Sequence, residues 1–255
     1  MKKIKFLSLS FLVIILIVFF FLNIETTRKI AINYEISEYK IPIHLKISDF
    51  FNRHYNYKNL VKHINNSHQN KKLTILNTSN WVNKNIQKTP AGIDIIDHHP
   101  LTIVHRRLGA QDQFSDILSV LLIYSNIDSF FKKRFGNIDH PLTFFKVNNY
   151  WSVLDPYHGV YFINENENFA SVEELKKSNW RIISLDSQNT NLTNIYLGKF
   201  KNYKDLEDHF KKLFNNIQSS KEIDNINIFD RGGRSYTQKP INRLNFEIHK
   251  LFKRP

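Results

Sequence analysis

The stretch HPLTFFKVNNYWSVLDP, residues 140–156, decides the fold of the middle of the chain. Aromatic and β-branched residues lie on either side of Asn148 and Asn149, two residues that tolerate positive φ. This pattern predicts two antiparallel strands joined by a two-residue hairpin. A turn centred on the two asparagines makes His140 and Asp155 diagonal neighbours on adjacent strands. We therefore expect their side chains to be within reach of each other.

The segment before the hairpin predicts a buried helix. It begins within HRRLGAQDQFSDIL, residues 105–118, where Gly109 suits a tight entry. Val120 and Ile123 add apolar residues away from the main apolar face, which indicates burial on more than one side. The main face has the i, i+3, i+4, i+7, i+8 spacing of a helix, with Phe114, Ile117, Leu118, Leu121 and Leu122.

The order of these features resembles the transglutaminase-like superfamily of papain-like enzymes. In that family a Gly-x-Cys begins a buried helix, a histidine begins a strand and an aspartate ends the next strand. Gly109, His140 and Asp155 occupy the matching positions over a region of roughly residues 73–185. The resemblance implies an α+β domain, with a buried helix packed on an antiparallel sheet.

The resemblance also implies a catalytic role that the sequence cannot fill. Gln111 stands where the family has its nucleophilic cysteine, and the chain contains no cysteine. By analogy, His140 is the former base and Asp155 the acid that orients it. An amide cannot act as a thiolate nucleophile, so the Gln111 side chain would instead hydrogen-bond His140 or a bound ligand.

Composition limits the partners that we expect. The net charge of +13 could indicate nucleic acid, but the lysines are scattered among acidic residues and no nucleic-acid module is present. The charge is also compatible with a basic surface that faces anionic lipid or acidic polysaccharide. We expect no nucleic-acid partner and no cofactor.

The N-terminus predicts a membrane anchor. Lys2, Lys3 and Lys5 precede an apolar run from Phe6 to Leu22, close to the roughly 20 residues of a spanning helix. The lysines favour a cytoplasmic N-terminus. We therefore expect residues 1–24 to be an uncleaved signal anchor, which predicts a single-pass protein of the inner membrane with an extracytoplasmic domain. A cleaved signal peptide is the alternative.

The rest of the chain divides by pattern into three parts. Residues 25–70 read as a juxtamembrane segment, residues 71–190 as the transglutaminase-like core and residues 191–255 as a C-terminal helical extension.

Several other residues are candidates for the site. Trp151 lies within the second predicted strand and faces the same side as Asp155. Tyr157 and His158 follow the end of that strand, and all three residues could line a cleft. Ser115, one helical turn after Gln111, is an alternative nucleophile. A loop also contains possible zinc ligands, but adjacent histidines seldom reach one ion and no HExxH pattern exists, so we expect no metal there. Those residues are Asp94, Asp97, His98, His99 and His105.

These observations lead to one favoured function and two alternatives. We expect a catalytically inactive, membrane-anchored, transglutaminase-like protein that binds a peptide, glycan or protein partner at the cell envelope, with a link to surface polysaccharide assembly. The first alternative is an active hydrolase or acyltransferase that uses a non-cysteine nucleophile or a metal. The second is a structural envelope-assembly protein whose motifs match by chance, which predicts that positions 111, 140 and 155 lie far apart.

Overall fold

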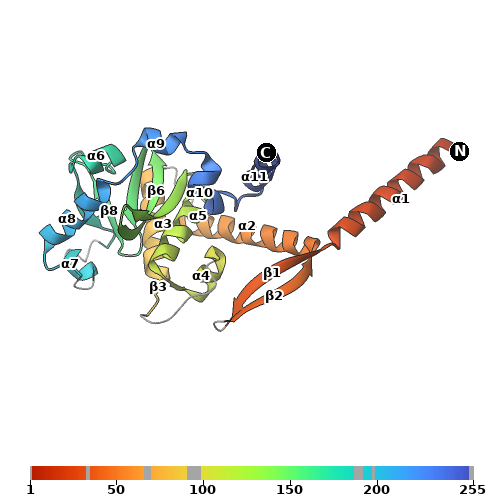
Figure 1. Ribbon diagram of the computed structural model, residues 1–255, viewed down its shortest axis with the longest axis horizontal. Coiled ribbons are helices and arrows are strands. Elements are labelled where there is room, and N and C mark those ends of the chain that lie inside the picture. The colour runs from red at the N-terminus through yellow and green to blue at the C-terminus, as the bar shows by residue number, and fades with distance from the viewer. Residues whose placement is uncertain are drawn as a thin grey trace.

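A computed structural model describes residues 2–32, 35–65, 70–90, 99–186, 192–196 and 199–252. The chain is an α+β fold built on one antiparallel sheet of five strands in the order β5-β6-β7-β8-β9 (Figure 1). Each strand therefore pairs with the next along the chain. The strands are β5 (Ser129–Phe135), β6 (Ile138–Val147), β7 (Tyr150–Asp155), β8 (Val160–Ile163) and β9 (Arg181–Ser184).

One face of the sheet packs against the predicted buried helix. This helix is α5 (Gln111–Tyr124), and every residue from Gln113 to its end is buried. Phe145 and Leu154 point from the sheet into this core, which fits the alternation of side chains along a strand. The core is completed by α2 (Ile43–Asn65), α3 (Lys71–Asn85) and α4 (Pro100–Arg106).

The opposite face forms a second core with helices that follow the sheet. Phe144 and Val153 point to this side, where they join Phe210 and Leu213 of α8 (Tyr203–Phe214). The segment expected to be a C-terminal extension thus supplies much of the cover for this face. Its helices are α7 (Leu192–Ile195), α8, α9 (Ser220–Asn225), α10 (Ile228–Tyr236) and α11 (Pro240–Phe252), with α6 (Val172–Lys176) preceding β9.

The expected juxtamembrane segment has more structure than its sequence pattern indicated. It contains a hairpin of β1 (Glu25–Ile32) and β2 (Glu35–Pro42), followed by the long helix α2. Tyr57 and Val61 of α2 belong to the first core. The hairpin and the N-terminal helix α1 (Lys2–Leu22) project beyond the sheet and its helices (Figure 1).

The prediction of a transmembrane helix was wrong. Among the described residues, none of the helices combines the length and the apolar character that crossing a bilayer requires. The predicted single-pass location in the inner membrane depended on that helix, and the same finding overturns it. The apolar side chains of α1 from Phe11 to Leu22 are exposed in this structure.

Candidate functional site

The β6–β7 hairpin brings His140 and Asp155 into contact. The strands pair with the register expected from the turn, with Phe144 opposite Val153. The Nε2 atom of His140 lies 2.8 Å from Oδ2 of Asp155, and both side chains are fully buried. The contact predicted from the turn is therefore present.

His140 lies inside β6 rather than just before it, at an irregularity in the strand. In the pairing with β5, Lys132 faces Leu142 and Arg134 faces Asp139. Two residues of β6, His140 and its neighbour, therefore oppose a single residue of β5, which is the arrangement of a β-bulge. Bulges of this kind re-aim a side chain, and the ring of His140 packs against α8.

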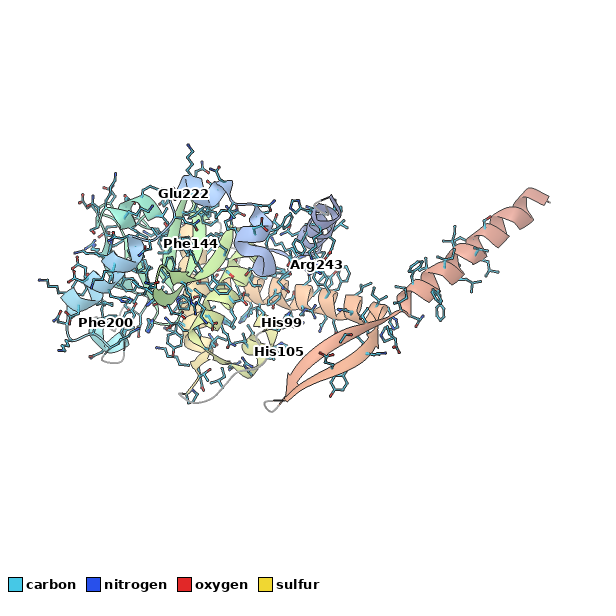
Figure 2. The ribbon with its side chains drawn as sticks, viewed as in Figure 1. His99, His105, Phe144, Phe200, Glu222 and Arg243 are labelled. Carbon is cyan, nitrogen blue, oxygen red and sulfur yellow. The ribbon has the colours of Figure 1, made fainter. Side chains whose placement is uncertain are left out.

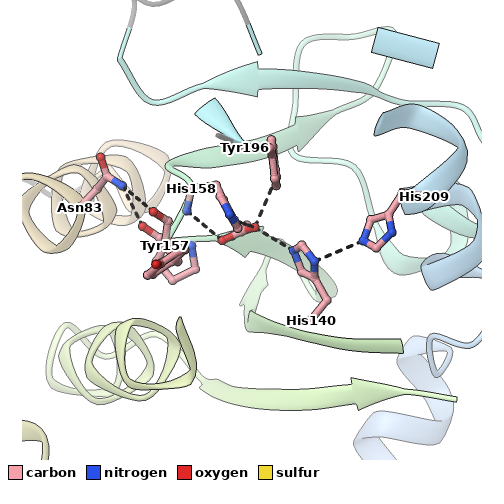
Figure 3. Close-up of polar contacts among 8 residues, drawn as sticks. Asn83, His140, Tyr157, His158, Tyr196 and His209 are labelled. Carbon is pink, nitrogen blue, oxygen red and sulfur yellow. Dashed lines mark hydrogen bonds and ion pairs between the residues drawn. The ribbon is translucent and has the colours of Figure 1, made fainter. Parts of the chain in front are cut away.

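Asp155 is buried and contacts His140, His158 and Tyr196, and Figure 3 shows these three partners around one carboxylate. Besides His140, its Oδ2 atom lies 2.7 Å from Nδ1 of His158 and accepts the Tyr196 hydroxyl at 3.3 Å. Its Oδ1 atom accepts the backbone N–H of His158 at 3.0 Å. The His158 ring also stacks on Tyr196, with centroids 4.0 Å apart.

The surroundings of Asp155 and Tyr196 determine the protonation state of both side chains. Burial alone would raise the pKa of Asp155, but the charges and hydrogen bonds of His158 and His140 outweigh it and hold the pKa well below its usual range. Burial and the Asp155 carboxylate raise the pKa of Tyr196 well above its ordinary value. Asp155 is therefore an anion at neutral pH, and Tyr196 remains a hydroxyl donor.

The second ring nitrogen of His140 is also engaged. Its Nδ1 atom lies 3.2 Å from Nε2 of His209 on α8 (Figure 3). Burial, followed by the proximity of His140, lowers the pKa of His209 to about 4. His209 is thus neutral at pH 7 and can donate a hydrogen bond to His140. In the predicted role His140 would offer one nitrogen to a nucleophile, but both nitrogens contact protein groups here.

The beginning of α5 lies at the same end of the sheet as His140. Lys133 falls opposite the bulge in β6, and its Nζ atom forms an ion pair with Asp112 in the first turn of α5 at 3.2 Å. Gln111 is the first residue of the helix. Its side-chain nitrogen is buried and has no hydrogen-bond partner among the described residues. This atom therefore makes no hydrogen bond to His140, and the expected contact with a ligand stays a prediction.

The entry to α5 is tightly packed. A Cβ atom at Gly109 would lie 3.2 Å from Cγ2 of Ile86 and 3.3 Å from Cγ2 of Ile103, so a larger residue would displace its neighbours. Gly109 forms β4 (Leu108–Gly109), which pairs in parallel with β3 (Gln87–Lys88).

The β3–β4 pairing positions Lys88, a residue that no sequence motif indicated. Its backbone is opposite Gly109, and its Nζ atom lies 4.6 Å from the centre of the Tyr157 ring. Tyr157 packs edge-on against Phe114 of α5. Burial lowers the pKa of Lys88, while the Asp155 carboxylate raises it. Lys88 has no ion pair within the described part of the chain.

The turn that holds Tyr157 and His158 is attached to α3. Asn83 donates from Nδ2 to the carbonyl oxygen of Pro156 at 2.9 Å (Figure 3). Gly159 follows with φ of +67°, and a Cβ atom there would lie 2.9 Å from Nδ2 of Asn83. Glycine is needed at this position both for its backbone conformation and for the close approach of Asn83.

Other candidates from the sequence lie outside this cluster. Trp151 is fully buried and donates from its indole to Asp224, with Arg231 over its ring, so it packs in the second core. Ser115 is also fully buried, and its hydroxyl has no partner among the described residues. It therefore lacks the base that a serine nucleophile needs.

The histidine-rich loop is only partly described. Asp94, Asp97 and His98 lie outside the described residues, while His99 caps α4 and His105 is in its last turn. Figure 2 shows both of these histidines beside α4. The group in the described chain that could hold a metal ion is a different one, formed by His140, Asp155 and His158. A surface hollow of about 450 Å³ lies elsewhere, beside Asn164, Trp180 and Arg181.

Comparisons with known proteins add little to this geometry. No family model and no curated relative matches the chain. A solved structure described as "a putative protease from Parabacteroides distasonis" is similar over 63% of this chain and 39% of that chain, with 11% identity and a TM-score of 0.35. At this level of similarity no superfamily is shown.

Proposed function

We propose that this chain binds a peptide through a carboxylate group beside the first turn of α5 and does not cleave it. The observation that carries the proposal is the unpartnered, buried side-chain nitrogen of Gln111 at the position of the missing nucleophile. A buried donor without an acceptor costs about 1–3 kcal/mol. An oxygen atom of a ligand would remove that cost.

Three features favour an anionic group at this place. The first is the N–H of Gln111, and the second is the beginning of a 14-residue helix, where orphan backbone N–H groups and the helix dipole favour negative charge. The third is Lys88, which contacts Tyr157 through its ammonium group and has no ion pair among the described residues. A charge-assisted hydrogen bond from such a lysine contributes about 1.5–3 kcal/mol.

The residues that could supply a nucleophile or a base argue against peptide cleavage. The chain has no thiol, and the buried hydroxyl of Ser115 has no hydrogen-bond partner among the residues that the structure describes. His140 uses one nitrogen for Asp155 and the other for His209. A general base must reach the proton that it removes, and His140 is held away from that task.

A binding titration tests the proposal. The probe is an N-acetylated dipeptide with a free C-terminal carboxylate, compared with the same dipeptide as an amide. We expect the carboxylate form to bind and to shift the NMR signal of the Gln111 side-chain amide. Lys88→Met should weaken binding at least tenfold. Lys84→Met, which removes an exposed lysine of α3, is the matched control and should leave binding unchanged.

Two outcomes would overturn the proposal. Equal binding by wild type and Lys88→Met, or by the carboxylate and amide probes, would show that the ligand is recognised without its charge. Peptide turnover that disappears in a folded His140→Ala variant would favour the active hydrolase or acyltransferase instead.

A further inference from the structure

One oxygen of Asp155 is crowded. Its Oδ2 atom lies 2.8 Å from Nε2 of His140, 2.7 Å from Nδ1 of His158 and 3.3 Å from the hydroxyl of Tyr196. The other oxygen, Oδ1, accepts the backbone N–H of His158. A carboxylate oxygen offers about two lone-pair sites. Oδ2 therefore has three polar groups around it and about two lone-pair sites.

We propose that His140, Asp155 and His158 form a binding site for one divalent ion of a first-row transition metal. The three candidate ligand atoms, one from each residue, all lie within 4.8 Å of one another. Two imidazoles and one carboxylate are ligands that Zn²⁺, Fe²⁺ and Mn²⁺ accept in proteins. An ion among these atoms replaces crowded hydrogen bonds with bonds to their lone pairs.

The two separations from Asp155 are compatible with direct coordination. Metal–ligand bonds to nitrogen and oxygen are about 2.1 Å long. Two ligand atoms 2.7–2.8 Å apart then subtend roughly 80–84° at the ion, from the same bond length. This angle is nearer to the right angle of octahedral geometry than to the tetrahedral angle. The Tyr196 hydroxyl, 3.3 Å from Oδ2, is the closest additional protein ligand.

The surroundings resemble those that support metal ligands. Metal-bound histidines usually hold their other ring nitrogen in a hydrogen bond, which fixes the ring. When Nε2 of His140 binds the ion, its Nδ1–H can donate to Nε2 of His209, which lies 3.2 Å away. His140 and Asp155 are fully buried and the side chain of His158 is 9% exposed. The ion would therefore be bound in an enclosed site, where bulk water competes weakly.

The metal site is independent of the proposed peptide binding. It uses the carboxylate and the two imidazoles, whereas peptide binding depends on Gln111 and Lys88. Metal content and peptide binding are therefore measured separately on the wild-type chain. Loss of one property without the other distinguishes failure of the two proposals.

Metal titration of the full chain tests the site. The protein is stripped with a chelator and titrated separately with Zn²⁺, Mn²⁺ and Co²⁺, and bound metal is measured by mass spectrometry after desalting. We expect one ion per chain. His158→Ala should lower the affinity at least 100-fold, and His209→Ala should lower it about 10–100-fold through the lost support. His63→Ala, at an exposed position of α2, should have no effect.

Several results would overturn the proposal. These are a wild-type chain that retains none of the three ions, a folded His158→Ala variant with unchanged affinity, and a loss of binding that follows His99→Ala or His105→Ala instead. If circular dichroism shows that His158→Ala does not fold, the wild type provides the test. Bound Co²⁺ should shift the imidazole proton signals of His140 and His158 in NMR spectra, and unshifted signals would refute the site.

Discussion

Replacing His209 with glutamine tests the electrostatic description of the buried cluster. In the folded chain, burial and the neighbouring His140 lower the pKa of His209 from 6.5 to about 4. The unfolded chain therefore binds more protons between these two values. Stability rises with pH where the unfolded state binds more protons, so the contribution of His209 is complete above pH 6.5 and decreases as pH falls towards 4. His209→Gln removes the titrating group and keeps an N–H donor for His140.

The size of this effect follows from the shift. A change of one pKa unit corresponds to about 1.4 kcal/mol, so the full shift would correspond to roughly 3 kcal/mol. His209 is only partly buried, and solvent screening reduces that value. By pH 5 the wild type should therefore lose about 1 kcal/mol more stability than the variant, relative to pH 7.5.

Urea unfolding at pH 7.5 and pH 5 measures this difference. Each protein is compared with itself at the two values, so any change that glutamine makes to packing cancels. An equal loss of stability in wild type and His209→Gln would refute the assignment of this pH dependence to His209.

Three further changes probe the cluster and its supports. Asp155→Ala should lower the free energy of unfolding by about 3–5 kcal/mol, because it leaves the partners of a buried carboxylate unpaired; an unchanged melting temperature would contradict this. Gly159→Ala should destabilise the chain by about 1–3 kcal/mol because of its positive φ and its contact with Asn83, and urea unfolding that matches wild type would speak against that strain. Gln111→Cys should react with iodoacetamide with an alkylation midpoint between about pH 6 and pH 8.5, because the helix N-terminus and Lys88 favour the thiolate while His140 is engaged elsewhere; an alkylation midpoint below about pH 6 would show a thiolate–imidazole pair.

The central hairpin and helix could be predicted because their signals are local. Asn148 and Asn149 have φ of 47° and 67°, as a two-residue turn requires, and this turn alone sets the pairing of β6 and β7. The contact between His140 and Asp155 follows from that pairing. His158 was a candidate because it comes three residues after Asp155.

The other members of the cluster could not be predicted in this way. His209 comes 69 residues after His140, and its place depends on how α8 packs against the sheet. Tyr196 and Lys88 likewise reach the cluster through tertiary packing, from segments without a recognisable motif. The apolar N-terminus was predicted to span a membrane from its composition and length, but none of the described helices is long and apolar enough to do so.

Product analysis tests the central claim most directly. The full chain is incubated with a mixture of peptides, with and without an added amine, and mass spectrometry measures both hydrolysis and acyl transfer for wild type and His140→Ala. If the chain binds peptides without cleaving them, neither protein will form product above the level in buffer. Product formed by wild type and lost in a folded His140→Ala variant would contradict the claim and assign catalysis to the buried cluster.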